Sequence, residues 1–488
     1  MSLLHKLAGQ TAIYGLSSIV GRLLNFLLVP LYTSIFAPEE YGTFSELMAV
    51  VAFAMVVLTY GFETSFFHFA NKEDSAEQTL STGFISLTAT SLLFIILSFS
   101  YTQPIANLLH VSSQPQYIQW LTLIVVLDVL STLPFAKLRL EQKAWRFATI
   151  RLINIAVNIG LNLFFFLLCP YLVSEGMAPF LTNYVYNPSI GIGYIFISNL
   201  IASLIMLGLL SPEILTLKMT FDLVVWKKMI RYGLPLLIGG LAYVTNEMVD
   251  RLLLKYLLPS NIASAEVGIY SACYKISIFM TLFIQAFRYG AEPFFFAQAE
   301  SEDAKEQYAK VMRYFIAFTG FIFLSINVFI DLLKHFIQNE TYHAGLEVVP
   351  ILLLANLFLG MYYNLSVWYK VSEKTRFGAY ISVFGACVTV FFNILLIPTM
   401  SYVGSAWATL LCYASMCLLS FILSRSHYPI SYPWKTIFTY LIAAFVLFYF
   451  WLQWHDAYFV VSTLVCIVYV FGVLMLEKRK KISTLSAK

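Results

Sequence analysis

Long apolar runs alternate with short polar segments along the whole chain, and the runs have the length of membrane-spanning helices. About 20 mostly apolar residues of α-helix cross the hydrocarbon of a bilayer. The runs are continuous, without the short alternating segments of a β-barrel. The pattern therefore predicts an all-α polytopic membrane protein with fourteen transmembrane helices. We place them near residues 10–36, 43–70, 80–102, 117–136, 146–169, 190–210, 229–258, 266–291, 309–331, 346–370, 377–397, 402–424, 434–452 and 456–476.

The positive charges fall almost entirely on one side of this topology. Cytoplasmic loops of membrane proteins carry an excess of Lys and Arg. With the N-terminus inside, 23 of the 30 Lys and Arg residues fall in inside segments, and Lys334 alone falls outside. The other six lie within predicted helices. The distribution supports the helix count and predicts cytoplasmic N- and C-termini.

The composition excludes a soluble protein, because 60% of the residues are hydrophobic and 11% are charged, against roughly 25% charged in soluble domains. The first apolar run is too long for a cleavable signal peptide, so we expect an uncleaved first helix. The six cysteines lie in apolar runs, and the seven histidines show no metal-binding spacing. We expect no metal, no cofactor and no nucleic-acid partner.

One stretch of the chain recurs more than two hundred residues later. Residues 40–47 read E-Y-G-T-F-S-E-L and residues 60–67 read Y-G-F-E-T-S-F-F. The second copy reads E-V-G-I-Y-S-A-C at 266–273 and Y-G-A-E-P-F-F-F at 289–296. Other motifs recur in the same order, which indicates two parallel six-helix repeats followed by two extra helices. We expect bundles at 1–215 and 216–427, appended helices at 428–476 and a basic cytoplasmic tail at 477–488.

Ionisable and amide side chains inside spanning helices are costly, so each one indicates either a polar cavity or a bond between helices. In the first helix, Arg22 and Asn25 share a face, and Arg22 has no acidic neighbour in its own helix. A guanidinium at membrane depth suits phosphate oxygens. An interhelical ion pair is the alternative.

The fifth helix carries a polar stripe at spacings of three and four, which places its members on one face. The stripe lines either a wet cavity or a packed interface, and we favour the cavity, with Arg151, Asn154 and Asn158 as substrate-binding candidates. Its members are Arg151, Asn154, Asn158 and Asn162.

The seventh helix carries Asn246, Glu247, Asp250 and Arg251. Glu247 and Arg251 stand four apart in the order that favours an ion pair within one helix. Asn246 and Asp250 share a neighbouring face, and Lys275 of the eighth helix is a candidate partner for Asp250. We list Asn246, Asp250, Arg251 and Lys275 as substrate-binding candidates and Glu247 as a structural ion-pair candidate.

The repeated motif ends in a carboxylate in both copies, at Glu63 and Glu292. Arg288 lies four residues before Glu292, so we expect a structural ion pair there. Glu63 has no such neighbour in its own helix, and Asp128 is a second lone acid in the fourth helix. Each is a candidate to bind a coupling proton or sodium ion, and the alternative for Glu63 is an ion pair with Arg22 or Arg151.

The opening stretch carries a resemblance to a known family. Residues 15–45, G-L-S-S-I-V-G-R-L-L-N-F-L-L-V-P-L-Y-T-S-I-F-A-P-E-E-Y-G-T-F-S, resemble the start of bacterial polysaccharide-biosynthesis (O-antigen/oligosaccharide) flippases. In those proteins an apolar helix leads through Pro-Leu-Tyr to a Tyr-Gly turn. The fourteen-helix pattern resembles the multidrug/oligosaccharidyl-lipid/polysaccharide exporter superfamily.

The resemblance implies a multi-pass flippase of the bacterial inner membrane. It would move polyprenyl-diphosphate-linked oligosaccharide from the inner to the outer face by alternating access, for surface polysaccharide such as the O-antigen of lipopolysaccharide. Arg22 matches the kind of cavity arginine that the family uses. Arg151, Arg251 and Lys275 are weaker matches, because only the helix on which each lies supports them. The implied partners are the lipid-linked glycan, the bilayer and other polysaccharide-assembly proteins.

Two alternatives remain open at this point. An ion-coupled multidrug antiporter of the same superfamily would want acids to dominate its cavity, whereas this chain has about as many buried bases. A membrane glycan polymerase or ligase would need reactive residues in the outside loops, which hold one lysine and few acids. We therefore expect a transporter and not an enzyme.

Overall fold

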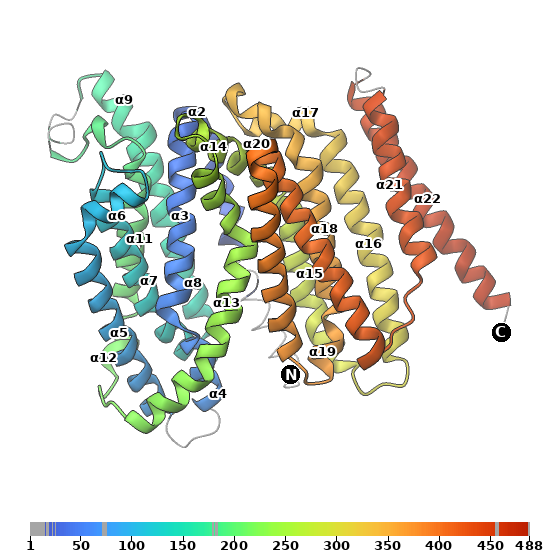
Figure 1. Cartoon of the computed structure of the whole chain (residues 1–488), viewed down its shortest axis with the longest axis horizontal. Coiled ribbons are helices and arrows are strands. Elements are labelled where there is room, and N and C mark those ends of the chain that lie inside the picture. Colours follow the sequence, from blue (N-terminus) through green and yellow to red (C-terminus); the bar gives the residue numbers. More distant parts are fainter. Residues whose placement is uncertain are drawn as a thin grey trace. The chain divides into compact units, whose positions relative to one another are not determined.

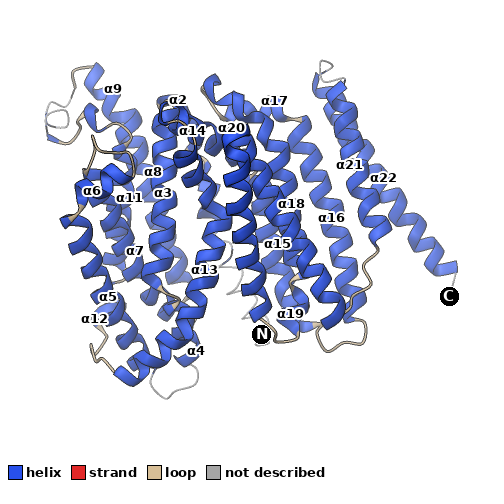
Figure 2. Ribbon diagram, viewed as in Figure 1, coloured by secondary structure: helices blue, strands red, loops and turns tan. Residues whose placement is uncertain are grey.

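The computed structural model describes residues 15, 19–21, 23–24, 26–70, 76–177, 180, 184–453 and 458–486. Within these residues the protein is helical and has no strand, as Figure 2 shows. By the contacts between its Cα atoms the chain forms two compact units, unit 1 at Met1–Lys255 and unit 2 at Tyr256–Lys488.

Unit 1 consists of long helices joined by short helical turns (Figure 1). Its elements are α2 (Val29–Ile35), α3 (Pro38–Thr59), α4 (Phe62–Ala70), α5 (Ala76–Ser100), α6 (Thr102–Leu108), α7 (Gln116–Leu140), α8 (Ala144–Leu163), the π-helical turn η1 (Phe164–Leu168), α9 (Cys169–Ser174), the 3₁₀ turn η2 (Pro188–Ile190), α11 (Gly193–Leu209), α12 (Ser211–Leu215) and α13 (Leu223–Leu257).

The second predicted helix is broken at the Tyr-Gly pair of its sequence motif. Pro38 opens α3, a position where the missing N–H of proline costs nothing. Tyr60 and Gly61 have φ angles of 30° and 75°, in the left-handed region that glycine favours. The Tyr-Gly pair therefore ends α3, and α4 begins at Phe62.

The first half of α13 packs against the region of this break. A Cβ atom on Gly233 would lie 2.5 Å from the carbonyl oxygen of Tyr60, so the two backbones approach closely. The Ser65 hydroxyl donates to the carbonyl of Met229 at 3.2 Å, and the Trp226 indole donates to Ser86 of α5 at 2.9 Å. These contacts place most of α13 in unit 1. The boundary expected near residue 215 separates two sequence copies, whereas the compact unit includes the first helix of the second copy.

Unit 2 is likewise built of long helices and short turns. Its elements are α14 (Ser260–Ile276), α15 (Ile278–Ala297), α16 (Ala304–Val328), α17 (Ile330–Leu333), the 3₁₀ turns η3 (Lys334–Phe336) and η4 (Glu340–Glu347), α18 (Val348–Leu365), α19 (Val367–Val371), α20 (Arg376–His427), α21 (Trp434–Gln453) and α22 (Tyr458–Ser486).

Two places in unit 2 depart from the helices that the sequence predicts. The eighth predicted helix is bent by 49° between α14 and α15. The element α20 joins the eleventh and twelfth predicted helices around Ser401, whose φ of 49° is not helical. A Cβ atom on Gly404 would lie 2.6 Å from the carbonyl oxygen of Leu396, so only glycine allows the chain to fold back this tightly.

The two appended helices pack on α16 within unit 2, where Figure 1 shows α21 and α22 in red. Arg313 of α16 binds Glu477 of α22 at 3.0 Å. The Tyr469 hydroxyl donates to the carbonyl of Ala317 at 3.1 Å, and Ser462 donates to that of Val328 at 2.8 Å. Polar contacts therefore hold α22 to α16 along its length.

Each of the fourteen predicted segments coincides with helix where the structure describes it. By length and apolarity, nine helices of the described residues could each cross a membrane, or ten if α14 and α15 form one span. Three helices account for part of the difference from fourteen. The helix α20 is counted once although it holds two predicted spans. The helix α11 is too short for the count, and the charged helix α13 does not enter it. The all-α multi-pass fold is confirmed. The count of fourteen and the cytoplasmic termini stay predictions.

Candidate functional site

The candidate residues divide into those whose polar atoms are bonded within the protein and those that keep bonding capacity. Arg22 and Asn25 lie outside the described residues, so their role in substrate binding stays a prediction.

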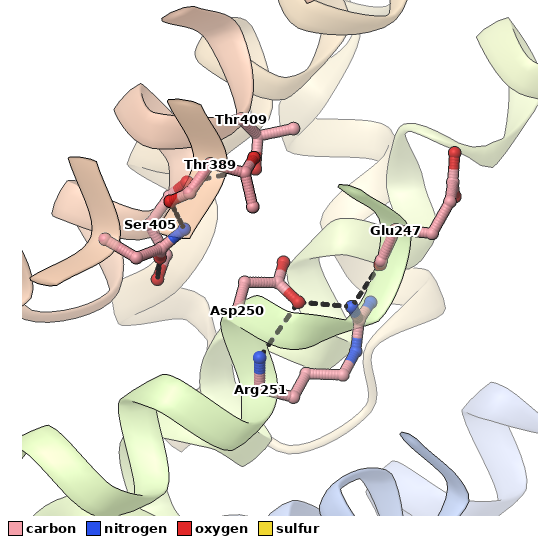
Figure 3. Close-up of polar contacts among 7 residues, drawn as sticks. Glu247, Asp250, Arg251, Thr389, Ser405 and Thr409 are labelled. Atoms are coloured by element: carbon pink, nitrogen blue, oxygen red, sulfur yellow. Dashed lines mark hydrogen bonds and ion pairs between the residues drawn. The ribbon is translucent and has the colours of Figure 1, made fainter. Parts of the chain in front are cut away.

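The seventh-helix candidates on α13 form a buried pair. Asp250 is 5% exposed and Arg251 is 6% exposed. The Arg251 Nη1 atom donates to Asp250 Oδ1 at 2.8 Å and to the backbone carbonyl of Glu247 at 2.9 Å, and the backbone N–H of Arg251 donates to the same Asp250 oxygen at 2.9 Å. Figure 3 draws this group. Arg251 thus binds the neighbouring Asp250 and the main chain of Glu247, and Asn246 is buried one turn earlier.

A second buried ion pair of unit 1 joins two residues that the sequence did not single out. Lys255 Nζ lies 3.5 Å from Glu46 Oε2, and their side chains are 8% and 1% exposed. Glu46 stands in the first half of α3 and Lys255 near the end of α13. Glu46 belongs to the first copy of the repeated motif, and an acid inside an apolar run was the signal that could have pointed to it.

The stripe on α8 is in part a bonded network. The Tyr32 hydroxyl donates to Asn162 Oδ1 at 2.9 Å. Asn162 Nδ2 donates to Asn158 Oδ1 at 2.7 Å, and Asn158 Nδ2 donates to Asn199 Oδ1 of α11 at 3.0 Å. Asn158 and Asn162 therefore join α2, α8 and α11, so their amides are satisfied inside the bundle.

Arg151 of the same stripe has a different environment. Its guanidinium lies over the Phe135 ring, 4.3 Å from the centroid, and the residue is exposed. Among the described residues, no carboxylate lies within 4 Å of it, although the charges of Asp128 and Glu63 attract it. Asn154, one turn further along α8, is half-buried and has no hydrogen bond from its side chain within the described part of the chain. Arg151 and Asn154 thus keep their capacity to bind a ligand.

The two ion-coupling candidates have partners. Ser203 of α11 donates to Asp128 Oδ1 at 2.8 Å. Glu63 binds Arg139 at the end of α7 at 3.0 Å, and the Arg139 guanidinium lies over Phe67, 4.6 Å from the ring centroid. The partner is therefore Arg139, where the sequence suggested Arg22 or Arg151, and Arg22 lies outside the described residues. A role for either acid in ion coupling stays a prediction.

The same arrangement recurs in unit 2 at the second copy of the motif. Glu292 binds Lys370 at the end of α19 at 2.7 Å and Arg288 at 3.5 Å, so the expected Arg288–Glu292 pair is present. The Arg288 guanidinium lies over the ring of Tyr363 at 4.2 Å. A small pocket lies beside the pair and is lined by Glu292, Phe295, Phe296, Tyr363, Ser366, Val367, Lys370 and Val371.

Unit 2 also has a buried amide–hydroxyl cluster on α20. Ser405 donates to Asn393 Oδ1 at 2.7 Å, Asn393 Nδ2 donates to the Thr389 carbonyl at 2.8 Å, and Thr409 donates to the Ser405 carbonyl at 3.0 Å. Figure 3 labels the serine and the two threonines. Lys275 is half-buried near the end of α14, just before the bend. Its role in substrate binding stays a prediction.

The structure offers no grouping of three or more His, Cys, Asp or Glu residues that could hold a metal ion within the residues that it describes. The described cysteines are free, and five of the six are buried.

Two family models match the chain. The family model described as "Polysaccharide biosynthesis protein" matches residues 7–293, and the MatE model matches residues 235–395. No curated protein sequence matches the chain.

Solved structures of transporters share the fold. The lipid II flippase MurJ in an inward closed conformation has a TM-score of 0.68 and 14% identity, covering 94% of this chain and 99% of its own. An inward-facing multidrug resistance transporter of the MATE family and MOP superfamily has a TM-score of 0.66 and 13% identity, covering 83% of this chain and 94% of its own. MATE transporter ClbM in complex with Rb⁺ has a TM-score of 0.54 and 16% identity, covering 88% and 96%.

These likenesses establish the fold, and the family model covers more than half of the chain. The protein is a multi-pass membrane protein with the fold of the MOP superfamily of transporters and flippases. The chain belongs to the polysaccharide biosynthesis protein family.

Proposed function

We propose that this protein is a flippase that moves polyprenyl-diphosphate-linked oligosaccharide from the inner to the outer face of a bacterial inner membrane, for surface polysaccharide such as O-antigen. The family match supports this function, and the MurJ structure supports a fold suited to a lipid-linked cargo. The head group would pass by alternating access while the lipid tail stays in the bilayer, and the protein would change no covalent bond.

The observation that carries the proposal is the state of Arg151. A buried or membrane-depth guanidinium is stable when it has an anionic partner or water. Arg151 is exposed, lies seven residues after the start of α8 and makes no ion pair within the described residues. Arginine presents a planar fork of donors that matches phosphate oxygens. We assign to Arg151 a contact with the diphosphate and to Asn154 a contact with the adjoining polar head group.

The other candidate cations, Arg251, Arg22 and Lys275, have weaker support as contacts of the diphosphate. Arg251 is hydrogen-bonded to Asp250 and to a backbone carbonyl. We therefore assign it a structural role in the site. Arg22 and Lys275 remain proposed contacts of the diphosphate on sequence grounds. Other polysaccharide-assembly proteins remain proposed partners.

The experiment uses a strain that lacks the gene and carries the wild-type protein or the variant Arg151→Gln. We expect the variant to reduce surface polysaccharide by about tenfold or more, because a charge-assisted hydrogen bond contributes about 1.5–3 kcal/mol and 1.4 kcal/mol is tenfold. Lipid-linked oligosaccharide should collect on the inner face. Arg376→Gln, at an exposed arginine that opens α20, is the matched control and should leave the polysaccharide unchanged.

Normal surface polysaccharide in a strain with Arg151→Gln at wild-type membrane levels would refute the assignment of Arg151. The MatE match at 235–395 favours a second function, an ion-coupled multidrug antiporter. Deleting the gene separates the two functions. Trapped lipid-linked oligosaccharide indicates the flippase, whereas normal surface glycan with raised sensitivity to cationic dyes indicates the antiporter.

A further inference from the structure

Glu46 is the most completely buried carboxylate among the ion pairs of the described residues. Its side chain is 1% exposed, and neither of its carboxylate oxygens has a hydrogen-bond partner among the residues that the structure describes. It lies eight residues after the first residue of α3, so about 12 Å along the helix at 1.5 Å per residue. A carboxylate without hydrogen bonds at this depth is an expensive group to keep charged.

The other buried ion pairs of unit 1 are better satisfied. Asp250 accepts two hydrogen bonds from Arg251, at 2.8 and 2.9 Å. The two carboxylate oxygens of the buried Glu213 lie 2.8 Å from Arg146 Nε and 3.1 Å from Arg146 Nη2. Lys255 stands 3.5 Å from Glu46 without forming a hydrogen bond to it. Because a purely structural buried pair needs close contacts to offset desolvation, the loose geometry indicates that Glu46 does more than hold α3 to α13.

The surroundings of Glu46 limit what it can bind. From α13 it faces Lys255, and the Asp250–Arg251 pair lies one turn earlier on that helix. Of the helices that contact α3, α2 carries Tyr32, which donates to Asn162. The titratable groups of α7 are Tyr117, Asp128, Lys137 and Arg139, of which Asp128 accepts from Ser203. The one charged residue of α5 is Glu77, in its first turn. Within the described part of the chain, the charge in contact with Glu46 is the ammonium of Lys255.

This arrangement favours a proton over a metal cation. The ammonium of Lys255, 3.5 Å from the carboxylate, already balances its charge, so the pair offers a metal cation no net attraction. No cluster of three acidic, histidine or cysteine ligands exists in the described part of the chain. A proton needs only one carboxylate oxygen, and Glu46 has two that accept no hydrogen bond.

We propose that Glu46 and Lys255 form a proton-binding site that couples proton movement to the transport of the head group. The coupling rests on the proposed flippase function, whereas the proton site does not. The carboxylate takes one proton from water and becomes a neutral carboxyl, Lys255 keeps its charge, and the pair loses its attraction. When the proton leaves to water on the other side, the carboxylate and the ion pair form again.

The direction of coupling follows from the position of the pair. Glu46 lies in the first half of α3, and Lys255 lies two residues before the end of α13. In the predicted topology both positions are nearer the outer face. Protons from the outer side would then enter at Glu46 and leave inside as the head group moves outward, which is an antiport.

The test compares Glu46→Gln, Lys255→Gln and the double variant. Removing one partner of a buried pair leaves an uncompensated charge and destabilises the protein, whereas removing both is often neutral. The double variant therefore keeps the fold available for measurement. Arg313→Gln with Glu477→Gln, which neutralises an ion pair of unit 2, is the matched control.

The first measurement is infrared difference spectroscopy of the purified protein during acidification. We expect a band from a protonated buried carboxyl in the wild type and the control, and its loss in Glu46→Gln and in the double variant. An identical band in Glu46→Gln would overturn the proton site, whether or not the protein is a flippase.

The second measurement follows the internal pH of proteoliposomes under an imposed pH gradient. The probe is lipid-linked oligosaccharide extracted from the deletion strain. We expect the probe to accelerate proton entry severalfold with the wild type and the control, and no acceleration with the double variant. If the double variant moves the probe with the same dependence on the gradient as the wild type, the pair is structural and the coupling is refuted. If the wild type does not move the probe, the proposed function fails while the infrared result still decides the proton site.

Discussion

Gly61 and Gly233 are the residues at which the end of α3 and α13 approach each other backbone to backbone. A Cβ atom on Gly233 would meet the Tyr60 carbonyl at 2.5 Å, and one on Gly61 would meet the Gly233 carbonyl at 2.9 Å. Both neighbours are backbone atoms that cannot rotate away. The end of α3 and α13 therefore cross at the Tyr-Gly pairs that are visible in the sequence.

We therefore expect Gly233→Ala to destabilise the protein, although alanine is the better helix former. The overlap with the backbone should cost about 1–3 kcal/mol, as overpacking does. The melting temperature of the purified protein measures the loss. Gly239→Ala on the same helix is the control, because nothing lies within 4 Å of its Cβ position, and it should not lower the melting temperature. Equal stability of the two variants would contradict the close crossing.

The asparagines show how far a sequence pattern reaches at the residue scale. The three-and-four spacing on α8 predicted one polar face, and Asn158 and Asn162 do bond to each other across one turn. The partners Tyr32 and Asn199 come from α2 and α11, more than thirty residues away in the chain. The spacing alone could not separate these satisfied amides from Arg151 and Asn154, which keep bonding capacity.

At the scale of elements, the internal repeat has a structural counterpart. In unit 1 the carboxylate of the Tyr-Gly-x-Glu motif pairs with Arg139 at the end of α7, and in unit 2 it pairs with Lys370 at the end of α19. Each cation follows its carboxylate by a similar distance along the chain. Both pairs join two helices within one unit, so the repeat preserves a connection between helices as well as a sequence motif.

The connection in unit 2 can be measured by reversing its charges. We expect Glu292→Lys and Lys370→Glu each to lower the melting temperature, because each creates like charges in contact. The double reversal should recover most of the loss. The side chains are 38% and 26% exposed, so solvent screening limits the coupling free energy to about 1 kcal/mol. Additive losses in the double variant would show that the two residues do not interact.

At the scale of the whole molecule, the distribution of positive charges predicts the membrane topology. We expect single cysteines at Ser112 and Thr341 to react with an impermeant maleimide in intact cells, and cysteines at Ser301 and Thr375 to react only after permeabilisation. All four residues are exposed in the structure. The background should lack the native cysteines, and membrane abundance of each variant is the control. Labelling of Thr341 and Thr375 from the same side would remove the span that contains α18 and overturn the helix count.

The sequence alone determined the all-α multi-pass fold, because crossing hydrocarbon requires runs of apolar residues that satisfy their backbone within a helix. It also revealed the repeat and placed the polar residues on their helices, because spacing in the chain fixes position on a helical face. Partners were decided by the tertiary structure, since Glu46 meets Lys255, Glu63 meets Arg139 and Asp128 meets Ser203 only after distant helices pack. Local periodicity carries no information on which helix faces which. For that reason the partner of Glu46, and the lack of hydrogen bonds to its carboxylate, became visible only in the folded protein.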